Sequence, residues 1–214
     1  MVVLITILLS LFVVGHILQI IITKRNYHFD IYFGVPGSGK TTMCAWLTKK
    51  YKKKHKNSSV FCNVDIKGTY EITKEDIGHY DISDGLLLFD EVGIDFNNRN
   101  FKTNFDKQQL EFFKKHRHHR VDVAIFSQFW EDPDKKLRDL TTRIFILKKS
   151  IIPFCISRRT IKKWVGINKE THQIEDQYKF VFMSRKIIFA PKVWKMFNTH
   201  DVYSLPYKKF KYRA

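Results

Sequence analysis

The chain has 214 residues, of which 44% are hydrophobic and 28% charged, so a disordered tail is excluded and one domain with a real core fits. Its 38 Lys and Arg against 21 Asp and Glu give a formal net charge of +17. We therefore expect a polyanionic partner, either nucleic acid or an anionic lipid surface, although a lysine-biased genome would give the same excess. Three widely spaced cysteines without a CxxC pair indicate neither a disulfide framework nor a zinc site.

The N-terminal segment, residues 1–25, contains an apolar run at residues 2–22 without Asp, Glu, Lys or Arg. A helix of about 20 apolar residues crosses the hydrocarbon core of a bilayer, so the run predicts one N-terminal transmembrane helix. A cleaved signal peptide and a buried or interfacial helix are the alternatives, but the run is long for the first and shows no polar face for the second. Lys24 and Arg25 follow the run. The positive-inside rule then predicts a single-pass protein of the inner (cytoplasmic) membrane, with its N-terminus outside and the remainder in the cytoplasm.

Strand and helix patterns alternate through residues 26–150, which is typical of an α/β fold with a parallel sheet and flanking helices. The expected strands cover residues 29–33, 60–64, 85–89, 121–126 and 144–147. The expected helices cover residues 40–56 and 104–116, and a short one, capped by Asp132 and started by Pro133, ends near residue 142. Short β-like pieces at residues 151–156, 164–167 and 178–183 predict a β-rich, basic C-terminal extension over residues 151–214.

Residues 34–42, GVPGSGKTT, match the phosphate-binding loop GxxxxGK[ST]. The motif follows an apolar strand and precedes an amphipathic helix, and the N-terminal end of such a helix attracts phosphate. We expect this P-loop to bind ATP, with Lys40 reaching the β- and γ-phosphates and the Thr41 hydroxyl binding Mg²⁺. The predicted nucleotide-binding residues are Gly34, Val35, Pro36, Gly37, Ser38, Gly39, Lys40, Thr41 and Thr42.

A second half of the site is predicted at Asp90 and Glu91, directly after the apolar strand LLLF. Asp90 is expected to hold Mg²⁺, and Glu91 to orient and deprotonate the attacking water. The alternative is a strand that ends in two solvated acids. With a P-loop about fifty residues upstream, the adjacent pair of carboxylates favours ATP hydrolysis.

Other polar residues have less specific signals. Gln128 ends the strand at 121–126, on the same edge of the sheet as the P-loop, where it can sense the γ-phosphate or be a plain turn residue. Arg138 is our candidate for the arginine finger that a neighbouring subunit would receive. Arg117, Arg120 and Arg143 are alternatives. The histidines at 116, 118 and 119 lie among Lys and Arg, so we interpret them as a polyanion-facing or interface stretch and not as a metal site.

Several segments in this order resemble the N-terminal ATPase domain of the zonular occludens toxin family, which includes assembly and export ATPases of filamentous phages. These are the P-loop, NVDIKG at 63–68, LLLFDE at 86–91, KKHRHHRVDVAIFSQ at 114–128 and APKVWKMFNTHDVY at 190–203. The family is similar to the FtsK/HerA-type DNA motors, so the resemblance implies a P-loop NTPase with a RecA-like parallel sheet. It also implies a homo-oligomeric ring, such as a hexamer, and phage coat or other assembly proteins as partners. In the familiar phage members the membrane span follows the ATPase domain, whereas here the apolar run precedes it.

Together these features predict a membrane-anchored ATPase that moves DNA for phage assembly, extrusion or packaging. It would bind ATP and Mg²⁺ and grip phosphates without reading sequence. One alternative is a membrane-bound scaffold that binds ATP with little turnover while it recruits coat protein or DNA. A small-molecule kinase shares the P-loop, but such an enzyme rarely needs the Asp-Glu pair or a membrane span.

Overall fold

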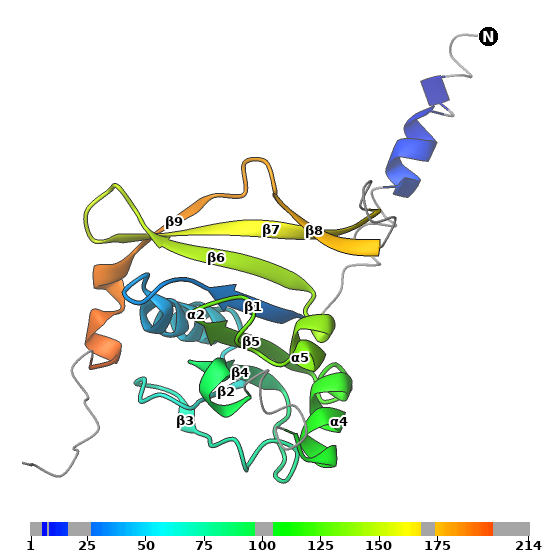
Figure 1. The fold of residues 1–214 in the computed structure, drawn as a ribbon. Helices are drawn as coiled ribbons and strands as arrows, with labels where there is room; N and C mark the ends of the chain where they lie inside the picture. Colours follow the sequence, from blue (N-terminus) through cyan, green and yellow to red (C-terminus); the bar gives the residue numbers. More distant parts are fainter. Residues whose placement is uncertain (1–5, 8, 17–26, 97–104, 168–173, 199–214) are drawn as a thin grey trace, which may run out of the picture.

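The computed structural model describes residues 6–7, 9–16, 27–96, 105–167 and 174–198 (Figure 1). They form one nine-stranded mixed sheet flanked by helices. Its parallel part has the order β3-β2-β4-β5-β1-β6, and the predicted parallel α/β fold is confirmed. The strands of this part are β1 (Phe29–Phe33), β2 (Ser59–Cys62), β3 (Tyr70–Glu71), β4 (Gly85–Phe89), β5 (Val121–Ser127) and β6 (Arg143–Lys149).

Antiparallel strands continue the sheet beyond β6. These are β7 (Cys155–Ile167), β8 (Ile174–Phe180) and β9 (Lys186–Phe189). One side of β7 pairs with β6, and its other side pairs first with β9 and then with β8. Two short 3-10 helices follow, η2 (Ala190–Lys192) and η3 (Trp194–Met196). The sequence predicted two short pieces where β7 is one long strand, because the basic residues in its middle interrupt the apolar pattern.

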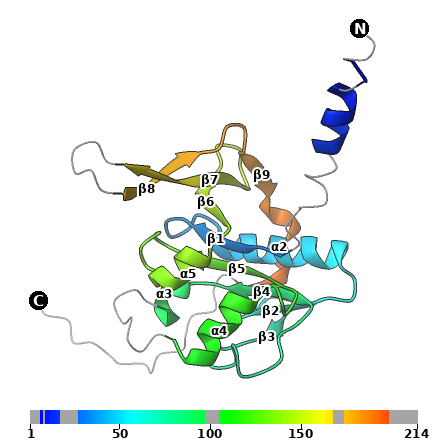
Figure 2. The same cartoon turned by 90° about the vertical axis from the view of Figure 1, so that its right-hand side faces the viewer.

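Helices cover both faces of the parallel strands (Figure 2). On one face lies α2 (Lys40–Lys54), and on the other lie α3 (Val92–Asp95), α4 (Lys107–Lys115) and α5 (Lys135–Leu140). Alternating side chains of β1 serve the two cores. Phe29 and Ile31 belong to the core under α4 and α5, whereas Tyr32 faces the α2 side and stacks between Phe126 and Phe145, at 4.9 and 4.7 Å between ring centroids.

Two local predictions were wrong. Asp134, not Asp132, caps α5 by accepting a hydrogen bond from the Lys136 N–H at 2.8 Å. The Asp132 carboxylate instead accepts from the Phe129 N–H at 3.0 Å, which closes the turn after β5.

His116 is the second correction, because it is buried rather than turned to a polyanion. Its ring packs edge-on against Phe29, and its Nδ1 lies 2.9 Å from the Phe113 carbonyl. Burial lowers the pKa of His116, so the neutral ring suits this position.

Most of the predicted membrane anchor lies outside the described residues. Residues 6–7 and 9–16 are helical and exposed. Within the part of the chain that the structure describes, no helix is both long and apolar enough to span a bilayer. The transmembrane helix over residues 1–25 therefore stays a prediction.

Candidate functional site

The P-loop connects the end of β1 to the start of α2, and its glycines allow it to wrap tightly. Gly39, the residue before α2, has φ +94°, which other residues rarely adopt. A β-carbon on Gly34 would lie 2.5 Å from the Leu147 carbonyl oxygen, so the loop rests directly on β6. The sequence thus folds into a compact loop at the N-terminal end of a 15-residue helix.

Polar groups of this loop suit a phosphate ligand. The Ser38 hydroxyl oxygen is buried and has no hydrogen-bond partner within the described residues. The Lys40 ammonium is also buried and donates to the Gly34 carbonyl at 3.2 Å. An orphaned hydroxyl and a buried ammonium beside a helix N-terminus fit the anionic phosphates of a nucleotide. The predicted binding residues at 34–42 therefore lie together in one cradle.

Thr41 and Asp90 meet at the first turn of α2. The Thr41 hydroxyl donates to Asp90 Oδ2 at 2.9 Å, and Asp90 is 5% exposed. Burial raises the pKa of Asp90, while the hydrogen bond from Thr41 opposes this shift. A hydroxyl and a carboxylate are oxygen ligands that Mg²⁺ prefers, so these two residues could hold the ion predicted from the sequence.

Asn63 fixes the position of Asp90, and no sequence pattern pointed to this role. Its side-chain oxygen accepts from the Asp90 N–H at 2.7 Å, and its amide donates to the Asp90 carbonyl at 2.9 Å. Asn63 follows β2, which is the neighbour of β4 in the sheet. Two sequence signals fell on Asn63, its place in the short apolar strand expected at 60–64 and its place at the start of the NVDIKG segment, and neither assigned it a role.

Glu91 turns toward the P-loop because the chain bends sharply after β4. Its φ of +51° is in the left-handed region, which is uncommon for a residue other than glycine. One carboxylate oxygen lies 3.2 Å from the Lys40 ammonium. A carboxylate in this place lies next to the phosphates that Lys40 would contact, as a base for water requires.

Gln128 lies at the same edge of the sheet. It follows Ser127, whose carbonyl accepts a hydrogen bond from the Gly34 N–H at 3.2 Å. The side chain of Gln128 is half-buried. Its backbone position beside the first glycine of the P-loop is compatible with the predicted contact to the γ-phosphate.

The arginine candidates lie elsewhere. The Arg138 guanidinium on α5 lies 5.7 Å from the centre of the Trp130 ring. Arg143 forms a two-pronged ion pair with Asp30, at 2.7 and 2.6 Å, near the start of β1. Arg120 pairs with Asp84 in the segment before β5. Because strands β1, β5 and β6 begin at the edge opposite the P-loop, Arg143 and Arg120 lie far from the P-loop of their own chain.

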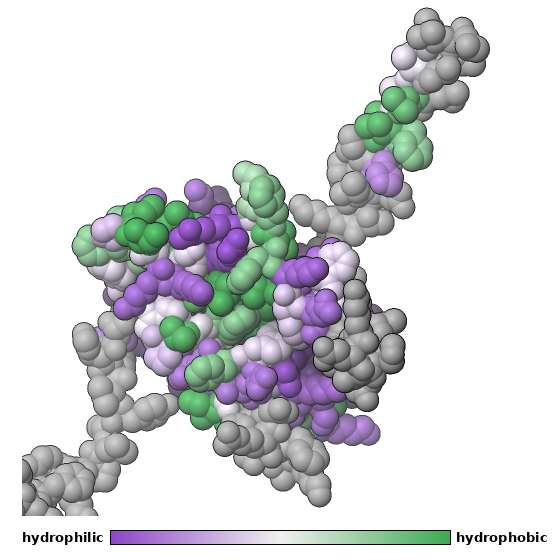
Figure 3. All heavy atoms as spheres, turned by 45° about the horizontal axis from the view of Figure 1, so that its top comes forward, coloured by the Kyte–Doolittle hydropathy of each residue, from purple (hydrophilic) through white to green (hydrophobic). Residues whose placement is uncertain are grey.

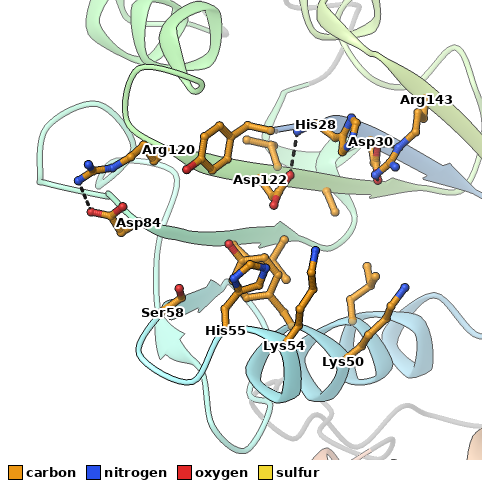
Figure 4. A pocket seen from close by; sticks show the side chains of 16 residues that line it. His28, Asp30, Lys50, Lys54, His55, Ser58, Asp84, Arg120, Asp122 and Arg143 are labelled. Atoms are coloured by element: carbon orange, nitrogen blue, oxygen red, sulfur yellow. Dashed lines mark hydrogen bonds and ion pairs between the residues drawn. The ribbon is translucent and has the colours of Figure 1, made fainter. Parts of the chain in front are cut away.

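A cavity of about 680 Å³ opens at that opposite edge, between α2 and the sheet (Figure 4). Lys50 and Lys54 line it from α2, and no carboxylate lies within 4 Å of either ammonium in the described chain. Burial, and after it the neighbouring positive charges, lower the pKa of Lys50. The acids of the cavity are mostly engaged, since Asp30 and Asp84 pair with arginines and Asp122 accepts from the His28 N–H at 2.8 Å. We call the surface of this cavity, with Lys50 and Lys54 from α2 and Arg120 from the segment before β5, the basic rim.

Metal sites built only from protein side chains are not apparent. In the ranges described above, no three His, Cys, Asp or Glu residues are grouped to hold a metal ion.

Cys44 and Cys62 are buried and Cys155 is half-buried, and all three are free. Burial raises the pKa of Cys62 to about 12, so its thiol stays protonated and acts as an apolar core group.

Comparison with known proteins connects this site to a family. The family model described as zonular occludens toxin (Zot) matches residues 46–186, more than half of the chain. The N-terminal domain of zonular occludens toxin from Neisseria meningitidis shares the fold, with a TM-score of 0.51 and 15% identity over 81% of this chain and 100% of that one. The DNA-packaging ATPase B204 of Sulfolobus turreted icosahedral virus gives a TM-score of 0.45 and 14% identity over 72% and 98% of the two chains. No curated protein sequence matches the chain.

Proposed function

The chain belongs to the zonular occludens toxin (Zot) family, and from this premise we propose that it is a membrane-anchored ATPase that moves nucleic acid during phage assembly, extrusion or packaging. The observation that carries the proposal is the joint placement of a P-loop, a pair of oxygen ligands suited to Mg²⁺ at Thr41 and Asp90, and a second carboxylate, Glu91, beside the Lys40 ammonium. A protein that only binds ATP would not need the Glu91 carboxylate, whereas ATP hydrolysis does.

The residues of the site divide the work of hydrolysis. Backbone N–H groups of the P-loop and the Lys40 ammonium bind and orient the phosphates. Glu91 orients a water molecule and accepts its proton, and Asn63 holds Asp90 in place through two hydrogen bonds. Thr41 and Asp90 would hold Mg²⁺, which would supply positive charge to neutralise the phosphates. Gln128 contacts the γ-phosphate, and Arg138 is kept as the candidate that a neighbouring subunit receives.

The positive charge of the basic rim is evidence for a polyanionic partner. Two stretches rich in Lys, Arg and His, residues 49–56 and 114–120, reach this cavity, the first through Lys50, Lys54 and His55 and the second through Arg120 (Figure 4). We assign this rim to sequence-nonspecific contact with DNA phosphates, in a homo-oligomeric ring that works with coat or other assembly proteins. Rising salt should then weaken DNA binding steeply, as measured by fluorescence anisotropy, and salt-independent binding would contradict the assignment.

The N-terminal anchor sets the orientation of the ATPase core. Tyr27 lines the cavity at the basic rim, whereas Ser38 lies in the P-loop at the opposite edge. An anchor directly upstream would hold the basic rim near the cytoplasmic face of the membrane, with the P-loop farther away. With the full chain in liposomes, a lipid-phase cross-linker should label Tyr27→Cys before Ser38→Cys. The reverse order would reject this orientation.

ATP hydrolysis by the full chain, with and without DNA, tests the function. Lys40→Ala should abolish hydrolysis because it removes the cation that binds the phosphates. A scaffold that uses ATP as a structural ligand is the alternative, and it predicts ATP binding without turnover under every partner condition.

A further inference from the structure

The polar groups around the P-loop define the direction in which a nucleotide lies. Asp90 and Glu91 follow β4, which lies beyond β5 on one side of β1 in the sheet, and β6 lies directly on the other side of β1. The γ-phosphate must approach Glu91, since water attacks there. The nucleoside therefore leaves the P-loop on the side of β6.

The end of β6 and the start of β7 border the P-loop on that side. A β-carbon on Gly37 would lie 3.9 Å from the Lys149 ammonium, and one on Gly39 would lie 2.5 Å from Ile156. Residues 150–154 form the turn between these two strands. In Figure 1 this turn lies at the same end of the sheet as the start of α2.

This turn exposes apolar side chains that the fold does not need in its core. Ile151 is 93% exposed and Phe154 is 64% exposed. The ring of Phe154 contacts Trp194 of η3 edge-on, with 5.8 Å between centroids. Figure 3 looks onto this side of the molecule and shows a hydrophobic patch at the left, where Figure 1 has the turn.

The backbone of Phe154 is also unusual. Its φ of +59° lies in the left-handed region, which is costly for a bulky residue. The Ala190 N–H donates to the Phe154 carbonyl at 2.9 Å and holds this conformation. Strained backbone clusters at functional sites, so an exposed aromatic residue in this conformation, in the turn between the two strands that border the P-loop, points to a function beyond packing.

We propose that Phe154, supported by Trp194, stacks on the purine base of the bound nucleoside triphosphate. This rests on the nucleotide binding of the proposed function and adds the residue that contacts the base. A flat aromatic ring beside the path of the nucleoside offers the stacking surface that a purine prefers.

Calorimetric titration of the full chain in detergent, with ATP and with inorganic tripolyphosphate, tests the proposal. Because tripolyphosphate has no base, Phe154→Ala should weaken ATP binding roughly ten-fold, the loss expected for one stacked base, and leave tripolyphosphate binding unchanged. Phe154→Trp should retain ATP affinity. Phe182→Ala, at an aromatic residue that is 88% exposed outside this turn, is the matched control and should bind both ligands normally.

Phe154→Gly keeps the test valid if the alanine variant fails to fold, because glycine adopts a left-handed φ without strain. Unchanged ATP affinity in the folded variants, or an equal loss for ATP and tripolyphosphate, would overturn the role of Phe154. If the wild-type chain binds neither ligand, the proposed function itself fails, and the two failures are thereby distinguished.

Discussion

At the scale of residues, the site joins groups from three strand ends that lie far apart in the sequence. Thr41, Asp90 and Glu91 were expected to meet because their motifs carry specific chemistry. No role was expected for Asn63, although it begins the NVDIKG segment, since a single polar residue at the end of a short strand has no pattern to distinguish it from a turn residue. Its two hydrogen bonds to the backbone of Asp90 become visible only when β2 and β4 are side by side.

The buried carboxylate of Asp90 predicts a conflict between stability and function. Burial raises the pKa of Asp90 above its unfolded value of 3.8. At a pH above the raised pKa, the buried charge therefore lowers the free energy of unfolding. At a pH below 3.8, Asp90 is protonated in both states and this cost is absent. Without Mg²⁺, Asp90→Asn should therefore raise the melting temperature at pH 7.5 by roughly 3 °C.

Thermal melting across a pH series measures this effect. The difference between Asp90→Asn and the wild type should shrink as the pH falls toward the unfolded value. Mg²⁺ with ATP should stabilise only the wild type. An asparagine variant that melts at a lower temperature at pH 7.5 would show that the carboxylate stabilises the free protein.

At the scale of elements, the apolar strands of the parallel part were predictable because both of their faces are covered, so their side chains form continuous apolar runs. The strands β3 and β9 escaped prediction, since one has two residues and the other is partly exposed. The arginines were ambiguous for another reason. A sequence cannot tell an arginine that waits for a neighbour's nucleotide from one that joins two strands, and Arg143 pairs with Asp30 across β1 and β6.

Arg143→Ala should therefore destabilise the fold while leaving the chemistry intact. Removal of the guanidinium leaves the buried Asp30 carboxylate without its partner, which should lower the free energy of unfolding by about 2 kcal/mol in chemical denaturation. Arg120→Ala is the control, because the Arg120–Asp84 pair is exposed and should contribute less than about 1 kcal/mol. ATP turnover per folded molecule should remain normal in Arg143→Ala, and its loss would instead make Arg143 part of the catalytic machinery.

At the scale of the whole molecule, the two edges of the sheet have different character. The P-loop and its acids lie at one edge, and the basic rim with the start of β1 lies at the other. The net charge predicted a polyanionic partner, but only the structure brings Lys50, Lys54 and the segment near Arg120 to one cavity. Separate edges for ATP and for the polyanion suit an enzyme in which hydrolysis at one end of the sheet moves a partner held at the other.

The measurement that tests this account most directly is phosphate release by the wild type and by Glu91→Gln, each with and without DNA and with ATP binding measured in parallel. Glutamine keeps the size of the side chain but cannot accept the proton of water. We expect DNA-stimulated hydrolysis by the wild type, and we expect Glu91→Gln to bind ATP normally with turnover reduced at least about a hundred-fold. Normal turnover by Glu91→Gln, or ATP binding without any hydrolysis by the wild type, would contradict the account.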